Sequence, residues 1–99
     1  MSLGPAASVG RIVHVNLGRD TRPGHATDER EHVRPAIVVR TWGDTPESAI
    51  NVQVLADGSN DVGLEYLVTN KRDPEAGPVW LTSILQGEGV GQWRWPPRV

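Results

Sequence analysis

Short apolar runs, bounded by glycine, proline and charged residues, divide the chain from one end to the other. In the first run, residues 10–17, Val13, Val15 and Leu17 fall on one side of an extended backbone, and Ile12, His14 and Asn16 fall on the other. This period of two predicts a half-buried β-strand. The second run, residues 36–43, is nearly continuously apolar, which predicts a strand covered on both faces.

Within the second run, the same period places Arg40 and Trp42 on the face of Val38. The third run, residues 50–58, alternates cleanly, with apolar side chains inward and Asn51 and Gln53 outward. It ends at Asp57-Gly58, a pair suited to a tight hairpin.

Three further strands are predicted beyond this turn. Residues 64–70 alternate, with Leu64, Tyr66 and Val68 on one side. In the run of residues 79–85, Trp80 shares a face with Thr82 and Ile84. A short last strand contains Trp93 and Trp95 on one face and Arg94 on the other, and Pro96-Pro97 ends its pairing.

We therefore expect one all-β domain over residues 1–99, a small antiparallel SH3-like barrel of five or six strands. An OB-like barrel has a similar pattern and stays an alternative. Residues 1–9 are expected to be flexible, and residues 18–34 to form a long polar loop. One helical turn within residues 26–33, capped by Thr27 or Asp28, is an alternative for part of this loop.

Composition excludes several classes of protein. The chain has no cysteine, which rules out a disulfide scaffold, a cysteine-based zinc ribbon and a cysteine nucleophile. Its net charge of −2 disfavours nucleic-acid binding through charge alone. No apolar run approaches the length of a membrane span, and no leader is apparent, so we expect a protein of the cytoplasm that does not bind membranes.

No catalytic or metal-binding constellation is apparent. His14, His25 and His32 lack the spacing of known zinc motifs, and His14 fits an ordinary strand position. Most carboxylates fall in loops rather than in pairs, and Ser83 lacks the surroundings of a nucleophile. We expect no enzyme activity, no cofactor and no metal.

The tryptophans are the main candidates for binding. The chain has four tryptophans, one tyrosine and no phenylalanine, so we expect at least two of the tryptophans in a core or a subunit interface. The alternative is a stacking surface for nucleobases, with arginines nearby for phosphates. Its candidate ligand-binding residues are Trp42, Trp80, Trp93, Trp95, Arg40, Arg94, Asn51, Gln53 and His14, with Arg34 as a further phosphate contact.

The pieces "GRIVHV", "RPAIVVRTWGDTPESAINVQVLADGSND" and "VWLTSILQGEGVGQWRWPPRV" resemble a family of small proteins of tailed phages and prophages. Its members begin with a "GRIVHY"-like strand and end with "GxWxWP". Here Val15 stands where that pattern has an aromatic residue, and the join before residue 79 is longer. The resemblance implies an accessory phage protein acting in the cytoplasm of an infected bacterium, and no particular activity.

Two functions remain open. One is a non-enzymatic sponge that sequesters a nucleotide signal of bacterial immunity, with its site between subunits. The other is a protein-interaction module, either a structural part of the virion or an inhibitor of a host protein. Because small β-proteins with exposed edges are often completed by a symmetric partner, we also expect a homo-oligomer.

Overall fold

The computed structural model describes residues 4–24 and 30–97. The elements in these residues are β1 (Ile12–Asn16), β2 (Val33–Thr41), β3 (Ile50–Val54), the 3-10 turn η1 (Gly58–Asp61), α1 (Glu65–Thr69), β4 (Val79–Ile84) and β5 (Trp93–Arg94). The helical turn considered for residues 26–33 begins outside the described residues.

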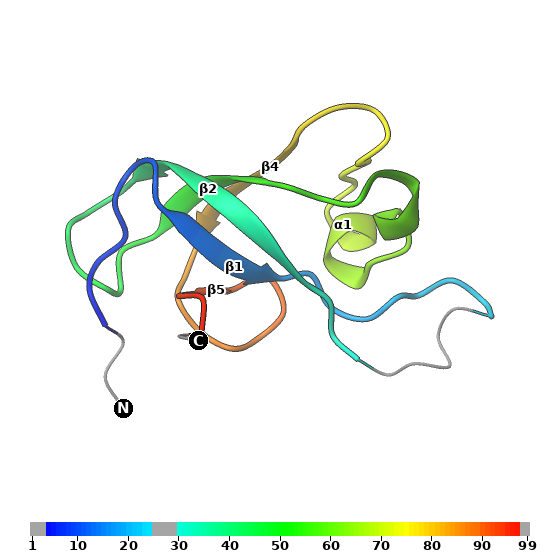
Figure 1. Cartoon of the computed structure of the whole chain (residues 1–99), viewed down its shortest axis with the longest axis horizontal. Helices are drawn as coiled ribbons and strands as arrows, with labels where there is room; N and C mark the ends of the chain where they lie inside the picture. Colours follow the sequence, from blue (N-terminus) through cyan, green and yellow to red (C-terminus); the bar gives the residue numbers. More distant parts are fainter. Residues whose placement is uncertain (1–3, 25–29, 98–99) are drawn as a thin grey trace.

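The strands form one antiparallel sheet in the order β4-β3-β2-β1-β5, which curls into a half-barrel (Figure 1). A parallel bridge between Gln86 and Trp93 connects the chain after β4 to β5, and the Trp93 N–H donates to the Leu85 carbonyl at 3.0 Å. These contacts bring the two edges of the sheet together at one corner. The predicted small, all-β, barrel-like fold of five strands is confirmed.

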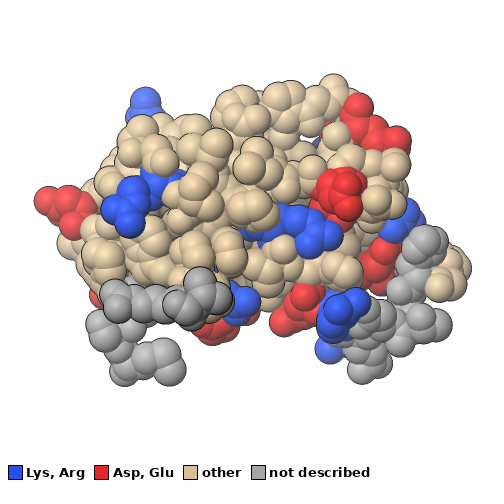
Figure 2. Space-filling view, in the orientation of Figure 1, with Lys and Arg blue, Asp and Glu red and all other residues tan. Residues whose placement is uncertain are grey.

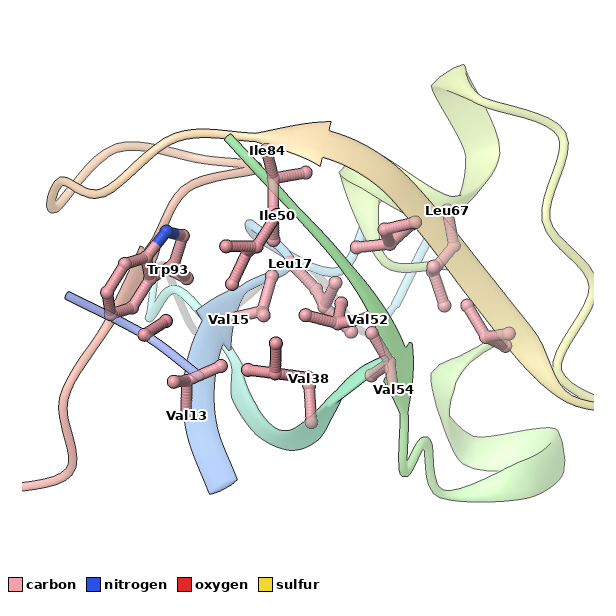
Figure 3. Close-up of a cluster of buried hydrophobic side chains, with 14 of the residues drawn as sticks. Val13, Val15, Leu17, Val38, Ile50, Val52, Val54, Leu67, Ile84 and Trp93 are labelled. Atoms are coloured by element: carbon pink, nitrogen blue, oxygen red, sulfur yellow. The ribbon is translucent and has the colours of Figure 1, made fainter. Parts of the chain in front are cut away.

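The core lies on the concave side of the sheet (Figure 3). Val13, Val15 and Leu17 of the first run are fully buried there, as their alternation predicts. The third run behaves in the same way, since Ile50, Val52 and Val54 are buried and the residues between them are half-buried. In these two runs one face is apolar and the other polar or mixed, so the period of two fixes the inward side.

The prediction that the second run is covered on both faces is wrong. Ala36 and Val38 are buried, but Ile37 is half-buried and Val39 is 42% exposed. No element described in the structure covers the convex side of β2. The apolar outer positions of this strand therefore belong to an open surface.

Two irregularities in the ladders correct the predicted faces. The pairing of β2 with β3 shifts between Val38 and Arg40, so that Arg40 stands opposite Asn51. An extra residue in one strand turns the side chains that follow, and Arg40 and Trp42 therefore face outward while Val38 faces the core.

The second shift lies in β4, where Ser83 adopts a φ of 54°. Trp80 and Thr82 share a face, as the alternation predicts, and that face is exposed, but Ile84 is buried on the core side instead of sharing it. The extra residue at the bulge is the reason.

The predicted strand over residues 64–70 is instead the helix α1. Leu64 and Leu67, three residues apart, are both buried, a spacing that suits one face of a helix. The first N–H groups of the helix find acceptors in the chain after β1, because Glu65 donates to the Arg19 carbonyl and Tyr66 to the Leu17 carbonyl. These tertiary hydrogen bonds favour the helix over a strand.

Asp57-Gly58 forms a turn but no hairpin, because it leads into η1 and α1 rather than back along β3. Asp61 of η1 is buried and accepts two hydrogen bonds from Arg34, at 2.8 and 2.9 Å, and a third from the Asp57 N–H. The described part of the polar loop is also attached here, since Thr21 donates twice to the Gly63 carbonyl.

Candidate functional site

Five of the predicted site residues lie together on the convex side of the sheet. Arg40 and Trp42 come from the end of β2, Asn51 and Gln53 from β3, and Trp80 from β4. The register places Arg40 opposite Asn51 and Gln53 opposite Trp80. We call this surface the outer tryptophan face.

Exposed apolar side chains contribute to the outer tryptophan face. Trp42 is 57% exposed and Trp80 is 47% exposed. Val39, next to Arg40 in β2, and Leu55, two residues after Gln53, are exposed to a similar degree. An indole presents about 150–250 Å² of surface, so the two tryptophans alone leave roughly 200 Å² open to solvent. The outer tryptophan face therefore combines two half-exposed indoles with the polar side chains of Arg40, Asn51 and Gln53.

Trp42 is exposed but held in one orientation. Its Nε1 donates to the Asn51 Oδ1 at 3.0 Å, and the Arg40 guanidinium lies 4.7 Å from the ring centroid. The same Oδ1 accepts the Ser83 N–H of the β4 bulge at 2.8 Å. Asn51 therefore connects Trp42 to the sheet, and its Nδ2 has no hydrogen bond to any of the described residues.

Trp80 lies at an edge of the sheet, since no strand in the described residues lies beyond β4. Its carbonyl accepts a hydrogen bond from Arg72 Nε at 2.9 Å, so the chain after α1 covers part of this edge. An edge with an occupied carbonyl is a poorer template for adding another strand. The side chain of Trp80, rather than its backbone, is what this region offers to a partner.

The other two tryptophans lie elsewhere. Trp93 is completely buried in the core, and Trp95 packs against it in a T-shaped arrangement with ring centroids 5.5 Å apart. The two share one side of β5, as their spacing predicts. The stacking platform of four tryptophans is therefore not assembled, since Trp93 is inaccessible to a ligand.

Trp95 borders a hollow that the sequence did not point to. Its volume is about 710 Å³, and it is lined by Gly4, Pro5, Gly10, Arg11, Ile12, Trp95 and Pro96. We call it the Trp95 hollow. The Arg11 guanidinium lies 5.2 Å from the Trp95 ring centroid, and Trp95 Nε1 donates to the Pro5 carbonyl at 3.0 Å.

One signal could have pointed to Arg11, because the alternation of the first run places it on the side of Val13 and Val15. The N-terminal segment carried no comparable signal. It was expected to be flexible, yet Ala7 is buried and Pro5 contacts Trp95.

The remaining predicted residues lie apart from the outer tryptophan face. His14 of β1 is half-buried, between Pro35 and Arg94 in the ladder. Arg94 forms a close ion pair with Glu88. Arg34, predicted as a phosphate contact, donates from Nε and Nη2 to the Asp61 carboxylate. Its guanidinium is therefore already paired and does not face a ligand.

Burial by itself would raise the pKa of Asp61, but hydrogen bonds from Arg34 and Asp57, with the charges of Arg34 and His32, outweigh it. The pKa of Asp61 is therefore held below its usual value. A carboxylate held ionised by a paired arginine in this way stabilises the fold, and its paired oxygens are not free to act as a base.

The described residues contain no group of three or more acidic or histidine side chains that could hold a metal ion. None of the helices in this part of the chain is long and apolar enough to cross a bilayer. Acidic and basic side chains are interspersed on the face drawn in Figure 2, without a continuous field of one sign. Comparison of the chain with protein-family models, curated proteins and solved structures gives no match.

Proposed function

We propose that the protein is a non-enzymatic binding module and that its outer tryptophan face docks on a protein partner. The observation that carries the proposal is Trp42, a large side chain that is 57% exposed and yet held by Asn51 and Arg40. Tryptophan and arginine dominate the energetics of protein interfaces. A side chain already ordered before binding loses little further entropy in the complex.

The shape of the face favours a protein over a small molecule. Small ligands bind in concave sites that bury most of their surface. The outer tryptophan face lies on the convex side of a curled sheet, and exposed Val39 and Leu55 belong to the same two strands or their ends. Such a surface suits a broad partner with apolar side chains, and Arg40, with no ion pair among the described residues, suits an acidic group beside them.

The setting we propose is that of an accessory phage or prophage protein in the cytoplasm of an infected bacterium, and the sequence resemblance alone supports it. The partner is then a host protein, a virion component or a second copy of the chain. A second copy would make the protein the homo-oligomer expected from sequence. Light scattering at micromolar concentration identifies that case before any other partner is sought.

The test compares immobilised variants in capture from host lysate and from purified virions. Trp42→Ala with Trp80→Ala removes both indoles, and Val68→Ala on α1, a residue 52% exposed, is the matched control. We expect one protein to be retained by the native chain and by the control, and at least about tenfold less by the tryptophan variant, as for a lost hot spot. Equal retention by all three chains would refute the proposal.

A nucleotide ligand is the second candidate, and the Arg40–Trp42 stack favours it, since aromatic faces with arginines bind nucleobases. Thermal shift with cyclic di- and trinucleotides and with ADP-ribose derivatives is the test. A stabilisation that disappears in Trp42→Ala would replace the protein partner with a nucleotide.

A further inference from the structure

Within the part of the chain that the structure describes, a short stretch of β1 has no neighbouring strand on one side. β5 pairs with β1 over only two positions, His14 with Arg94 and Val15 with Trp93. Continued by two residues, this register would place Pro96 opposite Ile12. Proline has no N–H to donate and ends a ladder, so β5 stops before it reaches Ile12.

The hydrogen bonds of β1 show which way Ile12 points. Bonds from Leu17 to the His32 carbonyl and from Val38 to the Arg11 carbonyl show that odd-numbered residues of this strand bond to β2. Asn16 instead exchanges bonds with Gly91 and Gln92 on the β5 side. Backbone groups alternate along a strand, so the N–H and C=O of Ile12 point to the β5 side.

These two backbone groups face the place that β5 leaves open. In residues 4–24 and 30–97, neither group has a hydrogen-bond partner. Ile12 is 43% exposed and lines the Trp95 hollow. An unpaired strand segment next to a hollow is a template for one more strand.

The walls of the hollow define what such a strand should carry. Trp95, Pro5 and Pro96 offer apolar surface, and the hollow has a volume within the usual range of about 300–1,000 Å³ for ligand pockets. The guanidinium of Arg11 stacks on Trp95 and has no acidic partner among the described residues. A carboxylate on the incoming chain would complement it.

We propose that the Trp95 hollow binds an extended peptide by strand addition to Ile12, with an acidic side chain of the peptide at Arg11 and an apolar side chain against Trp95. The backbone of Ile12 supplies one donor and one acceptor to the peptide, which is the mode of recognition in which main-chain bonds give affinity and side-chain pockets give specificity. This site is separate from the outer tryptophan face, and neither proposal depends on the other.

The free protein offers the first test, by amide hydrogen exchange of the isotope-labelled chain. Val13 and Val15 lie in pairs hydrogen-bonded to β2, so we expect their amides to exchange slowly and the Ile12 amide to exchange fast. Protection of the Ile12 amide that grows with protein concentration would mean that a second copy occupies this edge, which would overturn the proposal.

The second test uses three capped peptides, one of alternating valine and aspartate, one with lysine in place of aspartate, and one with the central amide of the aspartate peptide N-methylated. We expect the aspartate peptide to slow exchange of the Ile12 amide and to shift the Trp95 indole N–H resonance. The methylated peptide should bind at least about tenfold more weakly, because it loses a main-chain bond. Equal binding of all three peptides, or binding of none, would refute strand addition.

Matched variants locate the site. Ile12→Pro removes the N–H that the peptide needs but no bond to β2, whereas Ile12→Thr keeps the N–H. We expect the affinity for the aspartate peptide to fall by about tenfold in the proline variant and to stay unchanged in the threonine variant.

Arg11→Gln should remove the preference for the aspartate peptide over the lysine peptide, while Arg19→Gln, in the loop after β1, should retain it. Unchanged preference in Arg11→Gln would place the acidic contact elsewhere. Double replacement of Trp42 and Trp80 should leave peptide binding unaffected.

Discussion

The four tryptophans show how position in the fold decides what one residue type does. Trp93 fills the core, Trp95 covers its ring and borders the hollow, and Trp42 and Trp80 remain about half exposed on the convex side. Burial of Trp93 also lowers the stability of the fold, because its buried Nε1 has no hydrogen-bond partner in the described residues. Burying an unsatisfied donor costs about 1–3 kcal/mol, and the packing of a large ring in the core offsets this cost.

Replacing Trp93 with phenylalanine should therefore be much milder than replacing it with alanine. Phenylalanine removes part of the ring but also the unsatisfied N–H, so we expect a loss of about 1 kcal/mol in the free energy of unfolding. Alanine leaves a cavity beside Trp95 and should cost about 3–5 kcal/mol. Urea unfolding measures both values, and a loss for phenylalanine as large as that for alanine would contradict the cost assigned to the buried N–H.

Among the elements, α1 is the one that departs most from the predicted pattern, and its C-terminus explains how so short a helix ends. The Lys71 N–H donates to the Val68 carbonyl and the Arg72 N–H to the Leu67 carbonyl. These bonds form a Schellman motif, which requires a left-handed residue after the helix. Lys71 takes that conformation, with a φ of 56°, although glycine adopts it at less cost.

Lys71→Gly should stabilise the protein. A residue with a Cβ atom is strained by about 1 kcal/mol in the left-handed conformation, and glycine removes this strain. Part of the gain is lost because glycine increases the conformational entropy of the unfolded chain. We expect a net gain of roughly 0.5 kcal/mol in urea unfolding. As a control, Lys71→Ala keeps the strain and should give no gain. A loss of stability in the glycine variant would indicate that the lysine side chain contributes to packing or to an ion pair.

In the molecule as a whole, ion pairs connect the sheet to the elements that interrupt it between β3 and β4. Arg34 of β2 binds the buried Asp61 of η1. Arg22, in the loop after β1, pairs with Asp20 at 2.7 Å and donates to the Asn60 carbonyl at 2.8 Å. The contacts of Arg34 and Arg22 join β2 and the loop after β1 to η1, which directly precedes α1 at one end of the half-barrel (Figure 1). Charge pairs thus attach the segment between β3 and β4 to the rest of the fold, whereas Arg11 and Arg40 stack on tryptophan rings.

Arg34→Met should lower the free energy of unfolding at neutral pH by about 3 kcal/mol, because it leaves a buried carboxylate without its cation. In the native chain the pKa of Asp61 lies below its ordinary value of 3.8, so the stabilising contribution is present above that value and is lost as the pH falls through the lower, folded pKa.

The pH dependence of the variant should have the opposite sign. Without Arg34, burial raises the pKa of Asp61, so the variant gains stability relative to the native chain as Asp61 becomes protonated. The difference between the two chains should shrink on acidification from neutral pH, as followed by thermal unfolding. The control is Arg19→Met, whose stability should change with pH as that of the native chain does. If the stability of Arg34→Met also ran parallel to that of the native chain across this pH range, the role assigned to the ion pair would be contradicted.

Where one face of a strand was apolar and the other polar, the sequence was enough to predict the structure. The alternation in residues 10–17 and 50–58 predicted strands and their buried sides, and that of Trp93 and Trp95 predicted their shared face. Local pattern failed where a helix and a strand fit it equally well. Residues 64–70 satisfy both, and the carbonyls of Leu17 and Arg19, distant in sequence, favour the helix.

The candidate site depended more on tertiary structure. Sequence identified the tryptophans and arginines as a class, because few other residues of the chain could bind a large partner. Only the folded chain shows which of them lie on the outer tryptophan face and which lie in the core or elsewhere. The extra residues at Val39 and Ser83 change the face on which the following side chains lie, and no local pattern encodes these bulges. The hollow arises from the meeting of Pro5, Arg11 and Trp95 across the whole chain. Sequence thus determined which side chains were present and the period of the strands, whereas the register of distant segments decided which side chains meet.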